Sequence, residues 1–378
     1  MNITPYLKLM ADKGASDLFF TTGAPVSMKI EGDTKAVGKS PLEPGIVKQI
    51  AYSIMSDDQK EEFTHELEMN LGMSLKDIGR FRINIYLQRG EVSMVIRYIK
   101  AKIPSMDELN LPAKLKELIS LKKGLILVVG STGSGKSTTL ASMINYRNET
   151  TAGHILTIED PIEFSFNHMR SIVGQREVGL DTRSYSNALR EAMREAPDVI
   201  MIGEARDEET MKAALSYADT GHLCLTTLHS VNANQTLDRI LSFFSRDESN
   251  QILMDMSLNL KAIVSQRLIQ SRDGKRVAAI EILINTPYIS ELIRKGEFNE
   301  IKEVMEKGAT EGMQTFDQSL YELFKNGKID LKSALNNADS RSNLEWRINF
   351  GGEKEIDKGA ESEAMEFPSS MDDLPQVD

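Results

Sequence analysis

The stretch LILVVGSTGSGKST, residues 125–138, decides the fold of this 378-residue chain. Five apolar residues are typical of a buried strand, and the pattern G-x-x-x-x-G-K-[ST] follows them and opens a helix expected over 136–146. Glycines let the backbone wrap closely around a phosphate group, with N–H groups turned inward at the positive end of the helix. The stretch therefore predicts a phosphate-binding loop between a strand and a helix.

The loop supplies most of the candidate ligands for a nucleotide. Lys136 is expected to bridge the β- and γ-phosphates, and the hydroxyl of Ser137 is expected to bind Mg²⁺. The predicted nucleotide-binding residues of the loop are Gly130, Ser131, Thr132, Gly133, Ser134, Gly135, Lys136, Ser137 and Thr138.

Short apolar strands alternate with helices on the C-terminal side of the loop. The expected elements are strands at 155–159, 199–203 and 223–228, and helices at 188–194 and 208–217. Such alternation predicts an α/β fold with a parallel sheet covered on both faces. Residues 235–350 are expected to be mainly helical, apart from a strand pair near Leu268 and at 277–284.

Carboxylates follow two of these strands. The strand at 155–159 ends in Glu159, Asp160 and Glu163, and the strand at 199–203 is followed by Glu204. An acidic strand end is usually a solvated loop, but open α/β sheets bind ligands at the carboxyl ends of their strands. Beside a phosphate loop, one of the three carboxylates would orient and deprotonate water. Glu204 would hold Mg²⁺ through water or polarise the attacking water.

Two histidines, His222 and His229, flank the expected strand at 223–228. A single histidine is more often structural than functional. His229 follows the strand, at the expected catalytic edge, and is the better candidate for sensing the γ-phosphate. His222 precedes the strand and would contact a neighbouring element.

Charge and cysteine content exclude several classes of protein. The net charge is −11, and residues 351–378 carry nine acidic and two basic side chains, or −7. A protein that binds by neutralising phosphates needs the opposite balance, so nucleic-acid binding and DNA translocation are disfavoured. The single cysteine, Cys224, excludes a disulfide framework and fits a reducing compartment. Because no apolar run approaches the ~18 residues that cross a bilayer, we expect a cytoplasmic protein without membrane insertion.

The N-terminal 100 residues have a different pattern, which is typical of an α+β domain. The expected elements are a helix at 3–13 and strands at 16–20, 26–30, 80–86 and 92–99. Arginines at 80, 82, 89 and 97 gather on the last two strands. Either they keep a sheet edge soluble, or Arg82 and Arg97 reach a nucleotide from outside the phosphate-loop domain.

Composition shifts divide the chain into four parts. The predicted divisions are an N-terminal domain at 1–100, a linker with Pro104 and Pro112 at 101–114, a nucleotide-binding domain with C-terminal helices at 115–350, and a disordered acidic tail at 351–378.

Five segments resemble, in order, the motifs of the secretion-type hexameric ATPases. These segments are GSTGSGKSTTLASMI (130–144), ILTIEDPIEF (155–164), QREVG (175–179), APDVIMIGEARD (196–207) and TGHLCLTTLH (220–229). Within that superfamily, residues 1–345 resemble the PilT/PilU family of type IV pilus retraction ATPases. The PilU branch fits better, because the segments NANQTLDRILSFF (232–244) and GMQTFDQSLYELF (312–324) resemble PilU sequences and because of the acidic tail.

The resemblance implies a PAS-like N-terminal domain and a RecA-like P-loop domain, assembled as a homo-hexamer that uses ATP and Mg²⁺. It also implies roles for four residues. Glu163 would be the catalytic base, Glu204 the Mg²⁺-associated glutamate, and Arg82 and Arg97 the γ-phosphate contacts from the N-terminal domain. Arg176 would be either a further arginine finger or part of a structural ion pair.

The implied function is a motor that powers or assists pilus retraction from the cytoplasmic side of the inner membrane. The implied partners are a PilT-like ATPase and the inner-membrane platform protein of the pilus. The PilT-branch signature AIRNLIRE is YISELIRK at 288–295, so its LIR core alone remains, which leaves autonomous motor function open. The alternative is a nucleotide-binding coupling or scaffold partner with little hydrolysis. Pilus extension is disfavoured, because one cysteine cannot build the four-cysteine zinc site that extension ATPases usually carry.

Overall fold

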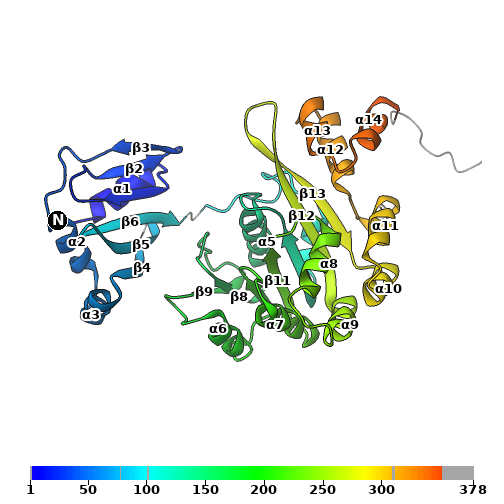
Figure 1. Cartoon of the computed structure of the whole chain (residues 1–378), viewed down its shortest axis with the longest axis horizontal. Helices are drawn as coiled ribbons and strands as arrows, with labels where there is room; N and C mark the ends of the chain where they lie inside the picture. Colours follow the sequence, from blue (N-terminus) through cyan, green and yellow to red (C-terminus); the bar gives the residue numbers. More distant parts are fainter. Residues whose placement is uncertain (1, 77, 100–101, 309–310, 351–378) are drawn as a thin grey trace, which may run out of the picture.

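The computed structural model describes residues 2–76, 78–99, 102–308 and 311–350, and the predicted acidic tail lies outside these residues. Figure 1 shows two lobes, each built on one β-sheet. Helices cover both faces of the larger sheet, so the predicted α/β fold is confirmed. Within the described part of the chain, no helix is long and apolar enough to cross a membrane.

The first sheet is antiparallel, with the strand order β3-β2-β1-β6-β5-β4. Its strands are β1 (Asp17–Phe20), β2 (Ser27–Ile30), β3 (Asp33–Ala36), β4 (Glu68–Leu75), β5 (Gly79–Gln88) and β6 (Glu91–Ile99). Helices α1 (Thr4–Asp12), α2 (Ile46–Ile54) and α3 (Asp57–Glu66) accompany it. Strand β3 was not predicted, because all four of its residues are exposed and none marks a buried face.

The second sheet has seven strands in the order β13-β12-β7-β11-β10-β8-β9. They are β7 (Gly124–Val129), β8 (Gly153–Glu159), β9 (Ser171–Glu177), β10 (Val199–Ile202), β11 (Leu223–Leu228), β12 (Leu260–Gln270) and β13 (Arg276–Ile284). All neighbours are parallel except β12 and β13, which a short hairpin joins and which are therefore antiparallel. The sheet is thus mixed, whereas the alternating pattern alone predicted parallel strands. Strand β9 escaped prediction, because its polar residues and the exposed Ile172 form no apolar run.

Both faces of this sheet are buried, which explains the unbroken apolar run of β7. Leu125, Leu127 and Val129 lie in one hydrophobic core, and Ile126 and Val128 lie in the other. The helices are α4 (Lys114–Ile119), α5 (Lys136–Thr150), α6 (Tyr185–Ala192), α7 (Glu208–Asp219), α8 (Ala233–Leu241), α9 (Ser249–Asn259), α10 (Pro287–Lys295), η1 (Phe298–Glu300), α11 (Ile301–Lys307), α12 (Phe316–Lys325), α13 (Leu331–Asn337) and α14 (Arg341–Phe350). Helices α4 and α5 contribute to the second core, and α6 to α10 contribute to the first.

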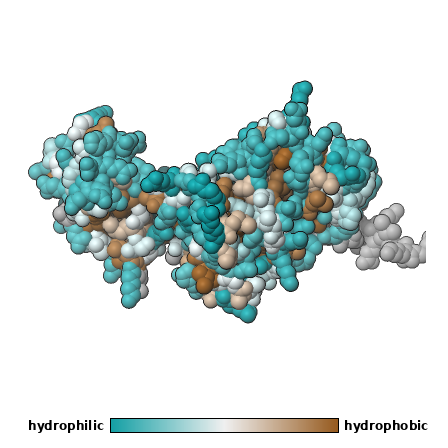
Figure 2. Space-filling view, turned by 90° about the horizontal axis from the view of Figure 1, so that it is seen from below, coloured by the Kyte–Doolittle hydropathy of each residue, from teal (hydrophilic) through white to brown (hydrophobic). Residues whose placement is uncertain are grey.

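The last three helices pack on β12 and β13 near their hairpin (Figure 1). Phe316, Leu320 and Leu344 form a small separate core there with Ile269 and Val277. The face of the molecule in Figure 2 is mostly hydrophilic, with separate hydrophobic patches.

Strands β7, β8, β10 and β11 are parallel, so their carboxyl ends meet at one edge of the sheet. The phosphate loop, the acidic segment, Glu204 and His229 follow these four strands in turn. The topology therefore gathers the predicted chemistry at one edge, where open α/β sheets bind ligands.

Candidate nucleotide site

The phosphate loop occupies residues 130–135, between the end of β7 and the start of α5. Gly130 has φ +155°, and a Cβ there would lie 2.4 Å from Ser134 Oγ and 2.5 Å from the carbonyl oxygen of Gln266. Gly135 has φ +91°, and a Cβ there would lie 2.8 Å from Gln266 Nε2. Both positions require glycine, because the backbone conformation and the close neighbour each exclude a side chain.

Lys136 begins α5 and turns its side chain back over the loop. Its Nζ donates hydrogen bonds to the carbonyl oxygens of Gly130, at 2.8 Å, and Ser131, at 3.0 Å. Burial lowers the pKa of Lys136, and the nearby carboxylates of Glu204 and Glu163 oppose that shift. Lys136 therefore lies between the loop and two carboxylates.

The loop and the acidic residues line one cavity of about 260 Å³. Its lining includes Thr132, Gly133, Lys136, Ser137, Glu159, Asp160, Glu163, Tyr185, Glu204, Arg206 and His229. Glu163 is exposed to solvent in this cavity, whereas Glu159 is buried behind it. The predicted catalytic residues thus surround one space.

Glu204 is the centre of a small charged cluster at the end of β10. Its Oε1 lies 3.2 Å from Nε2 of His229, and its Oε2 accepts a 2.8 Å hydrogen bond from Nε of Arg206. Arg206 also lies 3.8 Å from Asp160. The cluster joins the ends of β8, β10 and β11, and it brings Glu204 and His229 into contact at this edge of the sheet.

Glu159 is the buried acid of the site. Burial raises its pKa to about 7, although hydrogen bonds from Thr157 and Gln175 oppose that shift. Gln175 also donates to the carbonyl oxygen of Phe164 and accepts from the N–H of Phe166. Gln175 therefore ties the acidic segment to strand β9.

The raised pKa of Glu159 predicts a pH-dependent stability. In the folded protein the Glu159 carboxyl stays protonated up to about pH 7, whereas in the unfolded chain it loses its proton near pH 4.5. The stability that this protonated carboxyl contributes is therefore fully present below pH 4.5 and is lost as the pH rises to about 7. The change is at most about 3 kcal/mol. We expect Glu159→Gln to raise Tm relative to the parent at pH 8 and not at pH 4.5, measured by calorimetry. An equal shift at both values would contradict the assignment.

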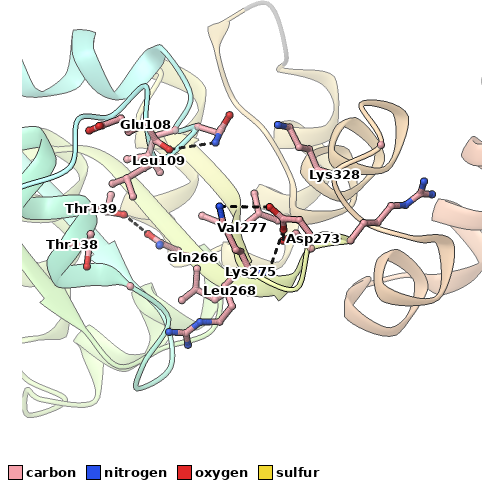
Figure 3. A pocket seen from close by; sticks show the side chains of 18 residues that line it. Glu108, Leu109, Thr138, Thr139, Gln266, Leu268, Asp273, Lys275, Val277 and Lys328 are labelled. Carbon is pink, nitrogen blue, oxygen red and sulfur yellow. Dashed lines mark hydrogen bonds and ion pairs between the residues drawn. The ribbon is translucent and has the colours of Figure 1, made fainter. Parts of the chain in front are cut away.

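A second cavity of about 660 Å³ lies on the other side of the start of α5 (Figure 3). Gly135, Thr138 and Thr139 contribute to it from the loop and helix, and Gln266 and Leu268 contribute from β12. The hydroxyl of Thr139 donates a 2.7 Å hydrogen bond to Oε1 of Gln266. Leu109, Leu111 and Val277 add apolar walls, and Lys275, Arg276 and Lys328 add cations.

Sequence reasoning missed Gln266, Arg206 and Tyr185. Gln266 is a buried polar residue within an apolar strand, a signal that points to a specific partner. Arg206 follows Glu204 by two residues, but this spacing indicates a site residue only once the position of Glu204 in the site is known. Tyr185 carried no signal of its own, since it enters the cavity through the packing of α6.

The structure places Arg82 and Arg97 away from the two cavities. Neither is among the described residues that line them. Nε of Arg82 lies 3.5 Å from Oε1 of Glu177, and Nε of Arg97 donates a 2.8 Å hydrogen bond to Asp17. Their predicted contact with a γ-phosphate stays a prediction.

Arg176 and His222, whose roles the sequence left open, have structural partners. Nη1 of Arg176 donates a 2.6 Å hydrogen bond to Glu195. His222 precedes β11, and its Nδ1 lies 3.2 Å from both the hydroxyl of Thr220 and the carbonyl oxygen of Tyr217. His222 is thus at the opposite end of β11 from His229.

The donor set of the first cavity fits Mg²⁺. Ser137 supplies a hydroxyl and Glu204 a carboxylate, and hard oxygen donors of this kind are what Mg²⁺ prefers. Ser137 and Glu204 are the residues that would hold it, directly or through water.

Fold and site together define a P-loop ATPase with a separate N-terminal sheet. Residues 2–346 match the family described as Type II/IV secretion system protein, and the chain belongs to this family. The chain is 50% identical over 358 residues to the type IV pilus ATPase PilU of Pseudomonas aeruginosa, covering 94% of each protein. It is 41% identical over 344 residues to PilT of that organism, covering 91% of this chain and 100% of PilT.

A solved structure agrees with these sequence relationships. The crystal structure of the pilus retraction motor PilT with bound ADP superposes with a TM-score of 0.84 at 42% identity, covering 91% of this chain and 99% of PilT. The Legionella pneumophila ATPase DotB superposes with a TM-score of 0.75 at 27% identity, covering 88% of this chain and 93% of DotB. The prediction of a PilT/PilU-type ATPase, with greater similarity to PilU, is confirmed.

Proposed function

We propose that this chain is a motor subunit that hydrolyses ATP to power or assist type IV pilus retraction. The observation that supports it most is the cavity that collects Lys136, Ser137, Glu163, Glu204 and His229 at the carboxyl edge of the sheet. The relatives named PilU and PilT, which match nearly the whole chain, support the pilus as the object of the work.

The proposed chemistry is in-line hydrolysis of the γ-phosphoryl group. Loop N–H groups and Lys136 bind the β- and γ-phosphates, and Glu163 accepts a proton from the attacking water. The water oxygen forms a bond to the γ-phosphorus as the bond to the β–γ bridging oxygen breaks, which leaves ADP and phosphate. His229, next to Glu204, senses the γ-phosphate. Mg²⁺, when bound, neutralises phosphate charge.

The second cavity is the proposed place for the nucleoside. It begins at Gly135 and Thr138, directly beside the phosphate loop, so a nucleotide would extend from one cavity into the other. Leu109, Leu268 and Val277 offer apolar surface for the base. PilT, which has been crystallised with ADP, supports an adenine nucleotide.

The proposed assembly is a ring of six at the inner-membrane pilus base. In it, residues 1–100 form a PAS-like domain, 101–114 a linker, and 115–350 a RecA-like domain. Arg82 and Arg97 reach the γ-phosphate when the N-terminal domain closes, so hydrolysis moves that domain. The partners are a PilT-like ATPase and the inner-membrane platform protein.

A deletion in the organism that carries this chain tests the pilus role. We expect excess surface pili and reduced twitching, because pili extend but retract poorly. The deletion is scored with and without a PilT-like gene, by electron microscopy and twitching-zone diameter. Loss of surface pili would instead indicate extension and would overturn the proposal. Equal ATP turnover by the parent and Lys136→Ala proteins would favour the scaffold alternative.

A further inference from the structure

A cross-lobe ion pair links the first sheet to the acidic segment. Arg82 lies on β5, and Glu177 is the last residue of β9 in the second sheet. The Glu177 side chain is 1% exposed, and its Oε1, 3.5 Å from Nε of Arg82, accepts no hydrogen bond from the described residues. Arg82 is therefore the cation in direct contact with a buried carboxylate, whose charge it compensates.

A second contact between the lobes lies beside this pair. Arg80, two residues before Arg82 on the same face of β5, lies 3.6 Å from Asp181. Asp181 belongs to the turn after Glu177, and its Oδ2 accepts a 2.9 Å hydrogen bond from the Glu177 N–H. The contact is similar in charge and distance but is more exposed to solvent.

The other oxygen of Glu177 reaches the segment that carries the proposed base. Oε2 accepts a hydrogen bond of 3.3 Å from the backbone N–H of Ile162, the residue directly before Glu163. Glu177 is also the register partner of Glu159, where that segment begins. Burial raises the pKa of Glu177, and the bond from Ile162 and the charges of Arg82 and Arg80 oppose that shift.

We propose that Glu177 is a positioning residue: its hydrogen bond with Ile162 fixes the position of Glu163, and that hydrogen bond depends on Arg82 of the N-terminal sheet. The proposal rests on the proposed function, because it takes Glu163 as the base. The Glu177 carboxylate contacts both the Ile162 N–H and Arg82. Because Arg82 lies on the N-terminal sheet, movement of that sheet would change how firmly Glu177 binds the acidic segment. If Arg82 moves to a γ-phosphate, Glu177 loses the ion pair that compensates its charge most directly, and its hold on Ile162 changes.

A kinetic comparison tests the positioning role. We expect Glu177→Ala to lower kcat about tenfold while KM for ATP changes less than about threefold, because misplacing the base affects the transition state more than binding. Glu177→Gln is expected to recover most of the lost rate, since its amide oxygen still accepts the Ile162 N–H. The matched control is Asp181→Asn, which weakens the neighbouring cross-lobe contact and leaves Ile162 untouched. A parental kcat in Glu177→Ala, or an equal loss in Asp181→Asn, would overturn the proposal.

Hydrogen exchange measured without nucleotide tests whether the order of the acidic segment depends on Arg82, because no phosphate is then present for Arg82 to contact. We expect peptides covering 159–166 to exchange faster in Glu177→Ala and in Arg82→Ala than in the parent. Arg97→Ala is the matched control, because Arg97 is the register partner of Arg82 but binds Asp17. Unchanged exchange in Arg82→Ala, or equal acceleration in Arg97→Ala, would contradict the link.

The two proposals fail in different ways. If Glu163→Gln hydrolyses ATP at the parental rate, the proposed chemistry is wrong. If Glu163→Gln loses activity and Glu177→Ala keeps it, the chemistry stands and only the role of Glu177 is overturned.

Discussion

Glu163→Gln is expected to lower kcat for ATP hydrolysis by about 10²–10⁴-fold, the usual contribution of a positioned general base. The amide keeps the size of the carboxylate but cannot take the proton from the attacking water. Glu163 is exposed in the cavity, so its loss leaves no buried partner unpaired. Binding of ATP is expected to persist, because removing a negative charge beside the phosphates does not weaken their attraction to Lys136. Phosphate release measures kcat, and fluorescence titration with an ATP analogue measures Kd.

Asp160→Asn is the comparison for this variant. Asp160 lies in the same segment and lines the same cavity, but Arg206 faces it at 3.8 Å. We expect its kcat to fall less than about tenfold, the size of one weakened charge contact. If Asp160→Asn lost more activity than Glu163→Gln, the base would be Asp160 instead.

Lys136→Ala is expected to reduce kcat/KM for ATP by about tenfold to a hundredfold, because a charge-assisted hydrogen bond contributes about 1.5–3 kcal/mol. Unlike the Glu163 variant, it is expected to weaken ATP binding as well, because Lys136 is the cation between the loop and the carboxylates of Glu163 and Glu204. Binding and turnover are measured as for Glu163→Gln.

The control for the lysine variant is Lys123→Ala. Lys123 is exposed and precedes β7, at the end opposite the phosphate loop. Its substitution by alanine therefore removes the same charge as Lys136→Ala but leaves the site unchanged. We expect its kinetics to match the parent. Lys136 also bonds two loop carbonyls, so Tm is compared in parallel. Parental ATP binding by a folded Lys136→Ala protein would exclude this loop as the phosphate site.

The shared location of Lys136, Glu163, Glu204 and His229 was predictable from sequence. Each follows a short apolar strand directly or within a few residues, and the carboxyl ends of parallel strands meet at one edge. No distance between them was needed for that inference. Gln266 was not predictable in this way, because it lies within β12 rather than after it. Its approach to Gly135 depends on β12 pairing with β7.

Elements without a buried repeat were also beyond prediction. Strand β9 forms an edge with Ile172 exposed, and β3 is exposed along its length. Their hydrogen-bonded neighbours define them as strands: β2 for β3, and β8 for β9. Periodicity reports burial, so it cannot detect a strand that backbone pairing alone holds.

The amino-acid order alone determined the phosphate loop, the α/β class and the family, because these depend on local patterns of glycine, charge and apolar residues. Tertiary structure alone decided the strand order, the antiparallel edge at β13 and the pairing of Arg82 with Glu177. The physical reason is that Glu177 follows Arg82 by 95 positions in the chain. Only the packing of the two sheets brings that cation to that buried carboxylate.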